Sequence, residues 1–312
     1  MNINFVNRKQ TRSGHKSLGI ALQGLIYFSG ISQVVFAASL VLAVIIPTRA
    51  VADSFFFSTG NVTNQIATAS RPSSPGKIEI ESADDFVLNA LTRINQATFT
   101  GLVTTGSTVS EVVIEIYRVF PNDSDVGRTS GPPNFSTPNV PTRVNSPSDV
   151  ELVSRDSSVA GELAFSTTTL AASFMALNSV LNGINHTTGG DGPVTGQEVQ
   201  FNVTFTDPFL LPGDHYFFVP QVLLNTGDFF WLSGTRPIVP PGTPFAPDLQ
   251  SWIRNANLDP DWLRIGTDIV GGSPAPMFNA AFTLTGTTPE PNSLILLGIG
   301  LVGFGWLLKR GG

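Results

Sequence analysis

Residues 198–205 read EVQFNVTF and decide the fold class. Apolar and polar residues alternate without interruption over this stretch. The apolar positions are Val199, Phe201, Val203 and Phe205, and the polar ones are Glu198, Gln200, Asn202 and Thr204. A period of two over eight residues predicts a β-strand with one face in a hydrophobic core and the other in solvent.

Four other segments also predict strands. They are residues 97–103, 111–120, 215–224 and 278–284. Residues 215–224 are apolar on both faces, which favours a central strand, although Pro220 indicates a bulge or an edge. Strands at irregular spacing, separated by Gly/Pro turns, predict an antiparallel β-sandwich, and a jelly roll is one arrangement that fits.

One segment, residues 170–185, has a different period. Leu170, Phe174, Leu177 and Leu181 recur at intervals of four and three residues, and Gly183 follows them. This spacing predicts one prominent helix, packed across an end of the sandwich.

The body shows no internal repeat and no linker that would divide it. Residues 53–288 are therefore expected to form a single β-sandwich domain. Residues 121–150 contain six prolines and no periodicity, so they predict a long surface loop, and residues 237–248 predict a shorter one.

Composition and charge exclude several classes of partner and chemistry. Of 312 residues, 41% are hydrophobic and only 13% are charged, and there is no cysteine, which excludes disulfides and thiolate metal sites. Residues 1–52 carry five basic and no acidic groups, and residues 289–312 carry two basic and one acidic. This leaves 10 basic and 22 acidic residues for the body, a net charge of −12. Such a body repels nucleic acid and anionic lipid.

The N-terminal segment has the order of a secretory signal. Basic residues precede an apolar run that is strongest over residues 34–46, and the small-x-small triplet Ala50-Val51-Ala52 follows. This order predicts a signal peptide over residues 1–52 with Asp53 as the first mature residue. An uncleaved N-terminal anchor is the alternative.

The C-terminal segment has three parts in order. Pro289, Glu290 and Pro291 interrupt regular structure, fifteen apolar residues follow over 294–308, and Lys309-Arg310 come next. A helix of that length spans about 22 Å, less than the bilayer core of about 30 Å. We expect a short transmembrane helix that Lys309 and Arg310 stop on the cytoplasmic side, with the body facing outward.

This tail resembles a PEP-CTERM sorting signal over about 24 residues. The resemblance implies an exported protein of an exopolysaccharide-producing Gram-negative bacterium. It also implies transient recognition, and processing, by an exosortase, a membrane cysteine protease. The chain would be anchored in the membrane through the helix before processing and would then reach the outer surface or the extracellular matrix. An ordinary tail anchor is the alternative.

Enzymatic chemistry is not indicated by any motif. The sequence has no Walker loop, GxGxxG, HExxH or GxSxG pattern, so we predict no catalytic residues. Loop carboxylates suit calcium, and the candidates are Asp123, Asp125, Asp149 and Glu151. Solvated loop acids are the alternative reading, and no other cofactor is expected.

Tryptophans are the candidates for stacking on sugar rings. They are Trp231, Trp252 and Trp262, and burial in the core is the alternative reading for all three. Three classes of function therefore stay open. The first is a non-enzymatic envelope or exopolysaccharide-matrix protein, the second a carbohydrate-binding module with exposed tryptophans, and the third a secreted hydrolase.

Overall fold

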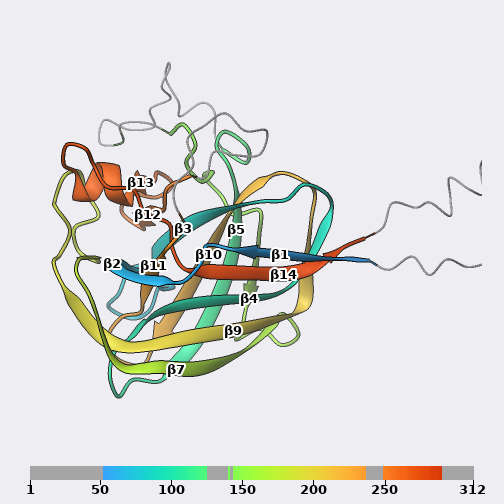
Figure 1. The fold of residues 1–312 in the computed structure, drawn as a ribbon, viewed down its shortest axis with the longest axis horizontal. Helices are drawn as coiled ribbons and strands as arrows, with labels where there is room; N and C mark the ends of the chain where they lie inside the picture. The colour runs from blue at the N-terminus through green and yellow to red at the C-terminus, as the bar shows by residue number, and fades with distance from the viewer. Residues whose placement is uncertain (1–51, 125–139, 141–142, 237–248, 290–312) are drawn as a thin grey trace, which may run out of the picture. The chain divides into compact units, whose positions relative to one another are not determined.

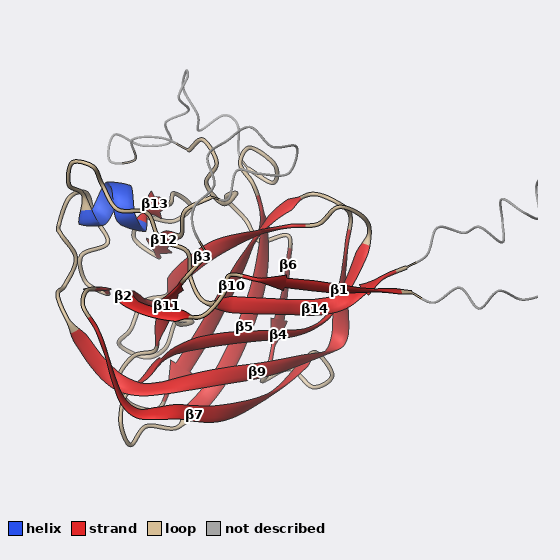
Figure 2. Ribbon diagram, in the orientation of Figure 1, coloured by secondary structure: helices blue, strands red, loops and turns tan. Residues whose placement is uncertain are grey.

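Alternating apolar and polar residues form strands along most of the body. The structure, a computed structural model, describes residues 52–124, 140, 143–236 and 249–289 (Figure 1). Its strands are β1 (Asp53–Ser58), β2 (Val62–Ala69), β3 (Ile80–Val87), β4 (Thr92–Val103), β5 (Val109–Arg118), β6 (Val153–Asp156), β7 (Leu163–Ala176), β8 (Ser179–Val180), β9 (Val194–Leu211), β10 (His215–Leu224), β11 (Phe230–Gly234), β12 (Trp252–Asn255), β13 (Leu263–Arg264) and β14 (Phe282–Thr288). Among the described residues, one short helical segment is present, Ile265–Val270 (Figure 2).

The strands form two sheets that pack face to face (Figure 2). The smaller sheet has the order β13-β12-β3-β10-β5-β6. In the larger sheet β7, β9 and β4 follow one another, and the other edge of β4 is shared by β14 and β11, which lead to β1 and to β2-β8 respectively. β2 pairs with β11, β3 with β10, β4 with β9 and β5 with β6. This nested pairing alternates between the sheets and is that of a jelly roll. The predicted antiparallel β-sandwich is confirmed.

The core lies between the sheets and contains the stretch that predicted the fold. Residues 198–205 belong to β9, and the four apolar side chains of that stretch are all buried. Phe201 stacks on Phe99 of β4 at 4.8 Å between ring centroids, and Phe218 of β10 stacks on Phe282 of β14 at 5.0 Å. Burial of these rings holds the two sheets together.

The other predicted strands are present with shifted ends. Residues 97–103 lie within β4, and 215–224 coincide with β10. The strand predicted over 111–120 is β5, which ends two residues earlier than expected, and the last predicted strand begins four residues later than expected, as β14. β10 is central, between β3 and β5. Its pairing with β3 ends at Phe218, so Pro220 lies where β10 is paired only with β5, opposite Ile114. Its missing N–H therefore removes no bond to β3.

The predicted helix over residues 170–185 is wrong. The first part of this segment completes β7, which pairs with β9, and the next part forms β8. Leu170 and Leu177 are 51% and 54% exposed, so the apolar spacing does not mark a buried stripe. The β-branched run 167–169 favours a strand. Residues 171–176 also pair with residues 194–198 of β9, whose backbone groups a helix would leave without these partners.

The two ends of the body lie side by side. β1 pairs with β14 in a register that sets Asp53 opposite Thr288. Phe57 of β1 packs against Phe282 at 5.4 Å between ring centroids. The folded body therefore begins at the residue expected to start the mature chain and ends immediately before the Pro-Glu-Pro triplet.

Truncation of a ring in the core tests how far stability depends on it. Phe218 is fully buried and contacts rings from the opposite sheet, so Phe218→Ala is expected to lower the free energy of unfolding by about 3–5 kcal/mol. Urea unfolding measures the loss. Leu170→Ala, on an exposed side chain, is the matched control and should change it by less than about 0.5 kcal/mol. Equal losses would contradict this account of the core.

Candidate functional site

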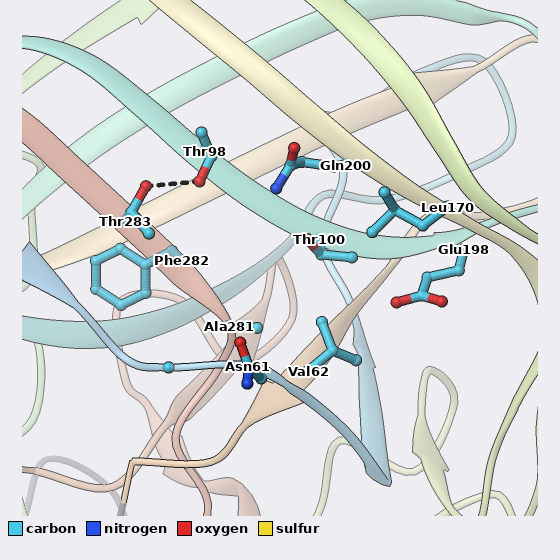
Figure 3. A pocket seen from close by; sticks show the side chains of 11 residues that line it. Asn61, Val62, Thr98, Thr100, Leu170, Glu198, Gln200, Ala281, Phe282 and Thr283 are labelled. Carbon is cyan, nitrogen blue, oxygen red and sulfur yellow. Dashed lines mark hydrogen bonds between the residues drawn. The ribbon is translucent and has the colours of Figure 1, made fainter.

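An open groove of 340 Å³ crosses the outer face of the larger sheet (Figure 3). It is bordered by the turn into β2 and by outward-facing positions of β4, β7, β9 and β14. Its lining consists of Gly60, Asn61, Val62, Thr98, Thr100, Leu170, Glu198, Gln200, Ala281, Phe282 and Thr283. Hydroxyl, amide and carboxyl groups therefore meet a few apolar side chains in one hollow.

The groove lies where β4 changes neighbours. β14 pairs with β4 as far as Phe99, and β11 pairs with it from Gly101 onward. Between them, the N–H of Thr100 donates to the carbonyl of Ala281 at 3.3 Å. A side chain at Gly101 would collide with the Phe229 ring and a neighbouring backbone carbonyl, so only glycine permits this close passage. The two neighbours diverge here and leave a hollow over the sheet.

The groove is polar and carries little charge. Glu198 is its one ionisable lining residue, and its carboxyl group turns inward beside Val62 (Figure 3). Partial burial raises the pKa of Glu198 above its ordinary value. The hydroxyls of Thr98 and Thr283 hydrogen-bond to each other at 2.6 Å across the floor. Such a surface offers donors and acceptors to a neutral, polar ligand.

Sequence reasoning identified the polar face of β9 but not the site on it. Glu198 and Gln200 alternate with core residues, so their side chains are expected on the outer face of the sheet. Their meeting with Thr98 and Thr283 depends on strand order, which the alternation does not contain.

The three tryptophans are buried, and the prediction that they stack on sugar from exposed positions is wrong. Trp231, Trp252 and Trp262 are 1%, 2% and 0% exposed. Trp231 lies between the sheets, and its indole N–H donates to the carbonyl of Ala281 at 3.0 Å. The indole N–H of Trp262 donates to the carbonyl of Ser148 at 3.1 Å. They are core residues because burial removes the large apolar area of each ring from water.

The calcium candidates that the structure describes are not gathered into a metal site. Asp123 pairs with Arg118 at 3.2 Å, and Asp149 is buried against Arg143. Arg143 also binds Asp261 at 2.8 Å. Glu151 is exposed, and Asp125 lies outside the described residues. Within the described part of the chain, no three metal-ligating side chains gather at one point. Asp123 and Asp149 instead form ion pairs with arginines.

Sequence reasoning missed a buried ionic cluster on the smaller sheet. The hydroxyl of Tyr117 (β5) donates to Glu81 (β3) at 2.6 Å, and Arg254 (β12) binds both. Arg254 also lies over the Trp262 ring at 4.5 Å. Glu115 adjoins Glu81, and burial, reinforced by the neighbouring carboxylates, raises the pKa of Glu115 well above its ordinary value. The cluster ties β12 to β3 and β5 within the smaller sheet.

The raised pKa of Glu115 predicts how stability depends on pH. The folded state binds this proton more tightly than the unfolded chain, so its stabilising effect is complete below the ordinary pKa of 4.5 and is lost as pH rises toward the folded value. Glu115→Gln keeps the shape without the charge. It should flatten the decline in melting temperature as pH rises above the ordinary pKa of 4.5, so its melting temperature should gain on that of the wild type as pH increases.

Asp53→Asn, at the exposed start of β1, is the control and should leave that decline unchanged. Calorimetric scans across the same pH values would contradict the assignment if both variants followed the wild-type curve.

The remaining predicted residues lie at or beyond the borders of the body. Ala52 precedes β1 and Pro289 follows β14, and both are exposed at the same end of this strand pair. Outside the described residues are Ala50, Glu290, Pro291, Lys309, Arg310 and the apolar run 294–308. None of the helical structure in the described ranges is long and apolar enough to cross a membrane.

The body is thus a jelly-roll domain with a polar groove, and its last strand runs directly into the tail. Residues 287–310 match the PEP-CTERM protein-sorting motif. The chain is therefore an exported protein that carries the tail by which an exosortase sorts its substrates. Among curated proteins and solved structures, none matches this chain. The motif begins within β14, so it joins the body without a spacer.

Proposed function

We propose that this chain is a non-enzymatic protein of the cell envelope or exopolysaccharide matrix. Its body is displayed outward on the C-terminal helix, is processed at the tail by an exosortase, and then acts by binding. The observation that carries this proposal is the sorting motif at 287–310, joined to a body that is complete at Thr288. Export would follow the signal peptide over residues 1–52.

The position of the tail supports processing without damage to the fold. Every core residue of the described body lies between Phe55 and Leu284. The motif overlaps only the last two residues of β14, Thr287 and Thr288, which are half-buried. Loss of the tail would therefore remove no buried side chain, and the released body would keep its structure.

The groove favours binding over hydrolysis. Glycoside hydrolysis uses two carboxyl groups that face each other across the sugar, whereas this groove has one, Glu198. A hydrolase is for this reason the least favoured of the three classes. Turnover of a glycan or an ester by the purified chain would overturn the non-enzymatic role.

Replacement of the triplet tests the sorting step. With Pro289-Glu290-Pro291 changed to three alanines, the exosortase should no longer recognise the chain. We expect the unprocessed form to accumulate in the membrane fraction, which fractionation and intact mass would show. Asn292→Ala, one residue beyond the triplet, is the control and should be processed normally. Wild-type mass and location in the triple variant would reject the assignment.

Carbohydrate binding is the second candidate function. Because the tryptophans are buried, the groove is now the candidate site for the sugar. Its hydroxyl and amide groups match the hydroxyls of a neutral sugar, and an acidic body disfavours an anionic polymer. Leu170 and Val62 offer apolar contacts to the less polar faces of a sugar ring.

Substitutions in the groove distinguish this candidate from a purely structural role. Gln200→Ala and Glu198→Gln should each weaken binding of neutral glucans, or of the exopolysaccharide from the producing cells, by about 5-fold, the effect of about one hydrogen bond. Calorimetry or retention on immobilised glycan measures the change. Gln96→Ala, on an exposed position of β4 outside the groove, is the matched control. Equal affinity in all variants, or binding to none of the glycans, would reject the groove as a sugar site.

A further inference from the structure

β7 forms a long open edge of the larger sheet. It spans 14 residues and pairs on one side only, with β9, along the border of the sheet seen in Figure 1. Residues 166–169 are all exposed. Beyond Ala176 the chain turns inward, where the N–H of Leu177 donates to the carbonyl of Asn64 at 2.8 Å. The preceding part of the strand therefore presents its backbone groups to solvent.

Natural sheets commonly protect such edges with charges, proline or very short strands, and β7 has few of these protections. The stretch from Leu163 to Gly190 contains no acidic, lysine or arginine residue. Register shifts occur only after Thr169, so residues 163–169 form a regular run. The other edge strands of the described body are short. β1 has six residues, one of which is the charged Asp53, β6 has four, and β8 and β13 have two each.

The charge of the body limits where two copies of this chain can meet. Two copies of a body with net charge −12 repel each other over most of their surfaces. The uncharged β7 edge is where they can approach without that repulsion. We propose that β7 pairs antiparallel with β7 of a second copy of this chain, about a two-fold axis, and joins the larger sheets of the two copies into one.

The geometry is self-complementary. Antiparallel pairing of identical strands about a two-fold axis satisfies the same backbone groups on both copies, as in an isologous dimer. The axis runs perpendicular to the sheet, so both outer faces point the same way. Both polar grooves then open on one continuous surface, and Leu170 brings the groove to the strand that pairs. A polymeric ligand could engage both at once.

The absence of cysteine gives a direct test in the full-length chain. Single cysteines at Ser166, Thr167, Thr168 and Thr169 should yield a disulfide-linked dimer under mild oxidation, strongest at the position nearest the axis. Paired residues in antiparallel strands lie about 4.5–5.5 Å apart between Cα atoms, within disulfide range. Light scattering on the wild-type chain in detergent should show a dimer that Thr168→Lys converts to a monomer with an unchanged melting temperature.

Two controls make the result decisive. Thr204→Cys is exposed but lies within the sheet on β9, so it should not cross-link. Ser54→Cys lies on the competing edge, β1. A monomeric wild-type chain, cross-linking at Thr204 as fast as on β7, or cross-linking at Ser54 alone would each overturn the proposal. Sugar binding does not enter these measurements, so the groove and the β7 edge stand or fall separately.

Discussion

Ring packing between the two sheets is the interaction on which the rest of this structure depends. A chain without cysteine must hold its body together by burial. Here Phe99, which stacks on Phe201 within one sheet, meets Phe218 of the other. This packing fixes which face of each central strand points inward. Because side chains alternate along a strand, it also fixes the outward face of β4 and β9, where the groove lies. The core and the groove are two consequences of one register.

The groove itself arises from a competition between neighbours. β4 is 12 residues long, and neither β14 nor β11 covers its edge alone. Where the pairing of β4 changes from β14 to β11, the outer surface is hollowed. The backbones approach so closely there that only glycine fits at position 101. A binding surface is thus produced by strand order, while the residues that line it keep their ordinary role as the polar face of a sheet.

Several charged side chains of this protein are internal. Glu81, Asp84 and Asp85 of β3 are all buried. Asp84 accepts a hydrogen bond from the N–H of Ala280 at 2.9 Å, and Asp85 accepts one from Leu249 at 3.0 Å. These carboxylates fasten covering segments onto the sheets, as Arg254 does through Glu81. A buried carboxylate that is fully paired specifies one arrangement, because each alternative leaves a charge unsatisfied. The uncharged β7 edge contrasts with this tightly fastened interior.

The order of three short segments determined the sorting tail. Periodicity by itself determined the strands around 198–205 and 215–224 and the sandwich class, because each depends on residues close together in the chain. It failed at 170–185, where spacing that also fits a helix belongs to a strand that β9 holds in place. It also left open whether Trp231, Trp252 and Trp262 are exposed, and it gave no sign that Glu198 meets Thr98 and Thr283. Only the tertiary structure decided these points. Burial and proximity depend on which strands become neighbours, and that choice is set by contacts between residues distant in the chain.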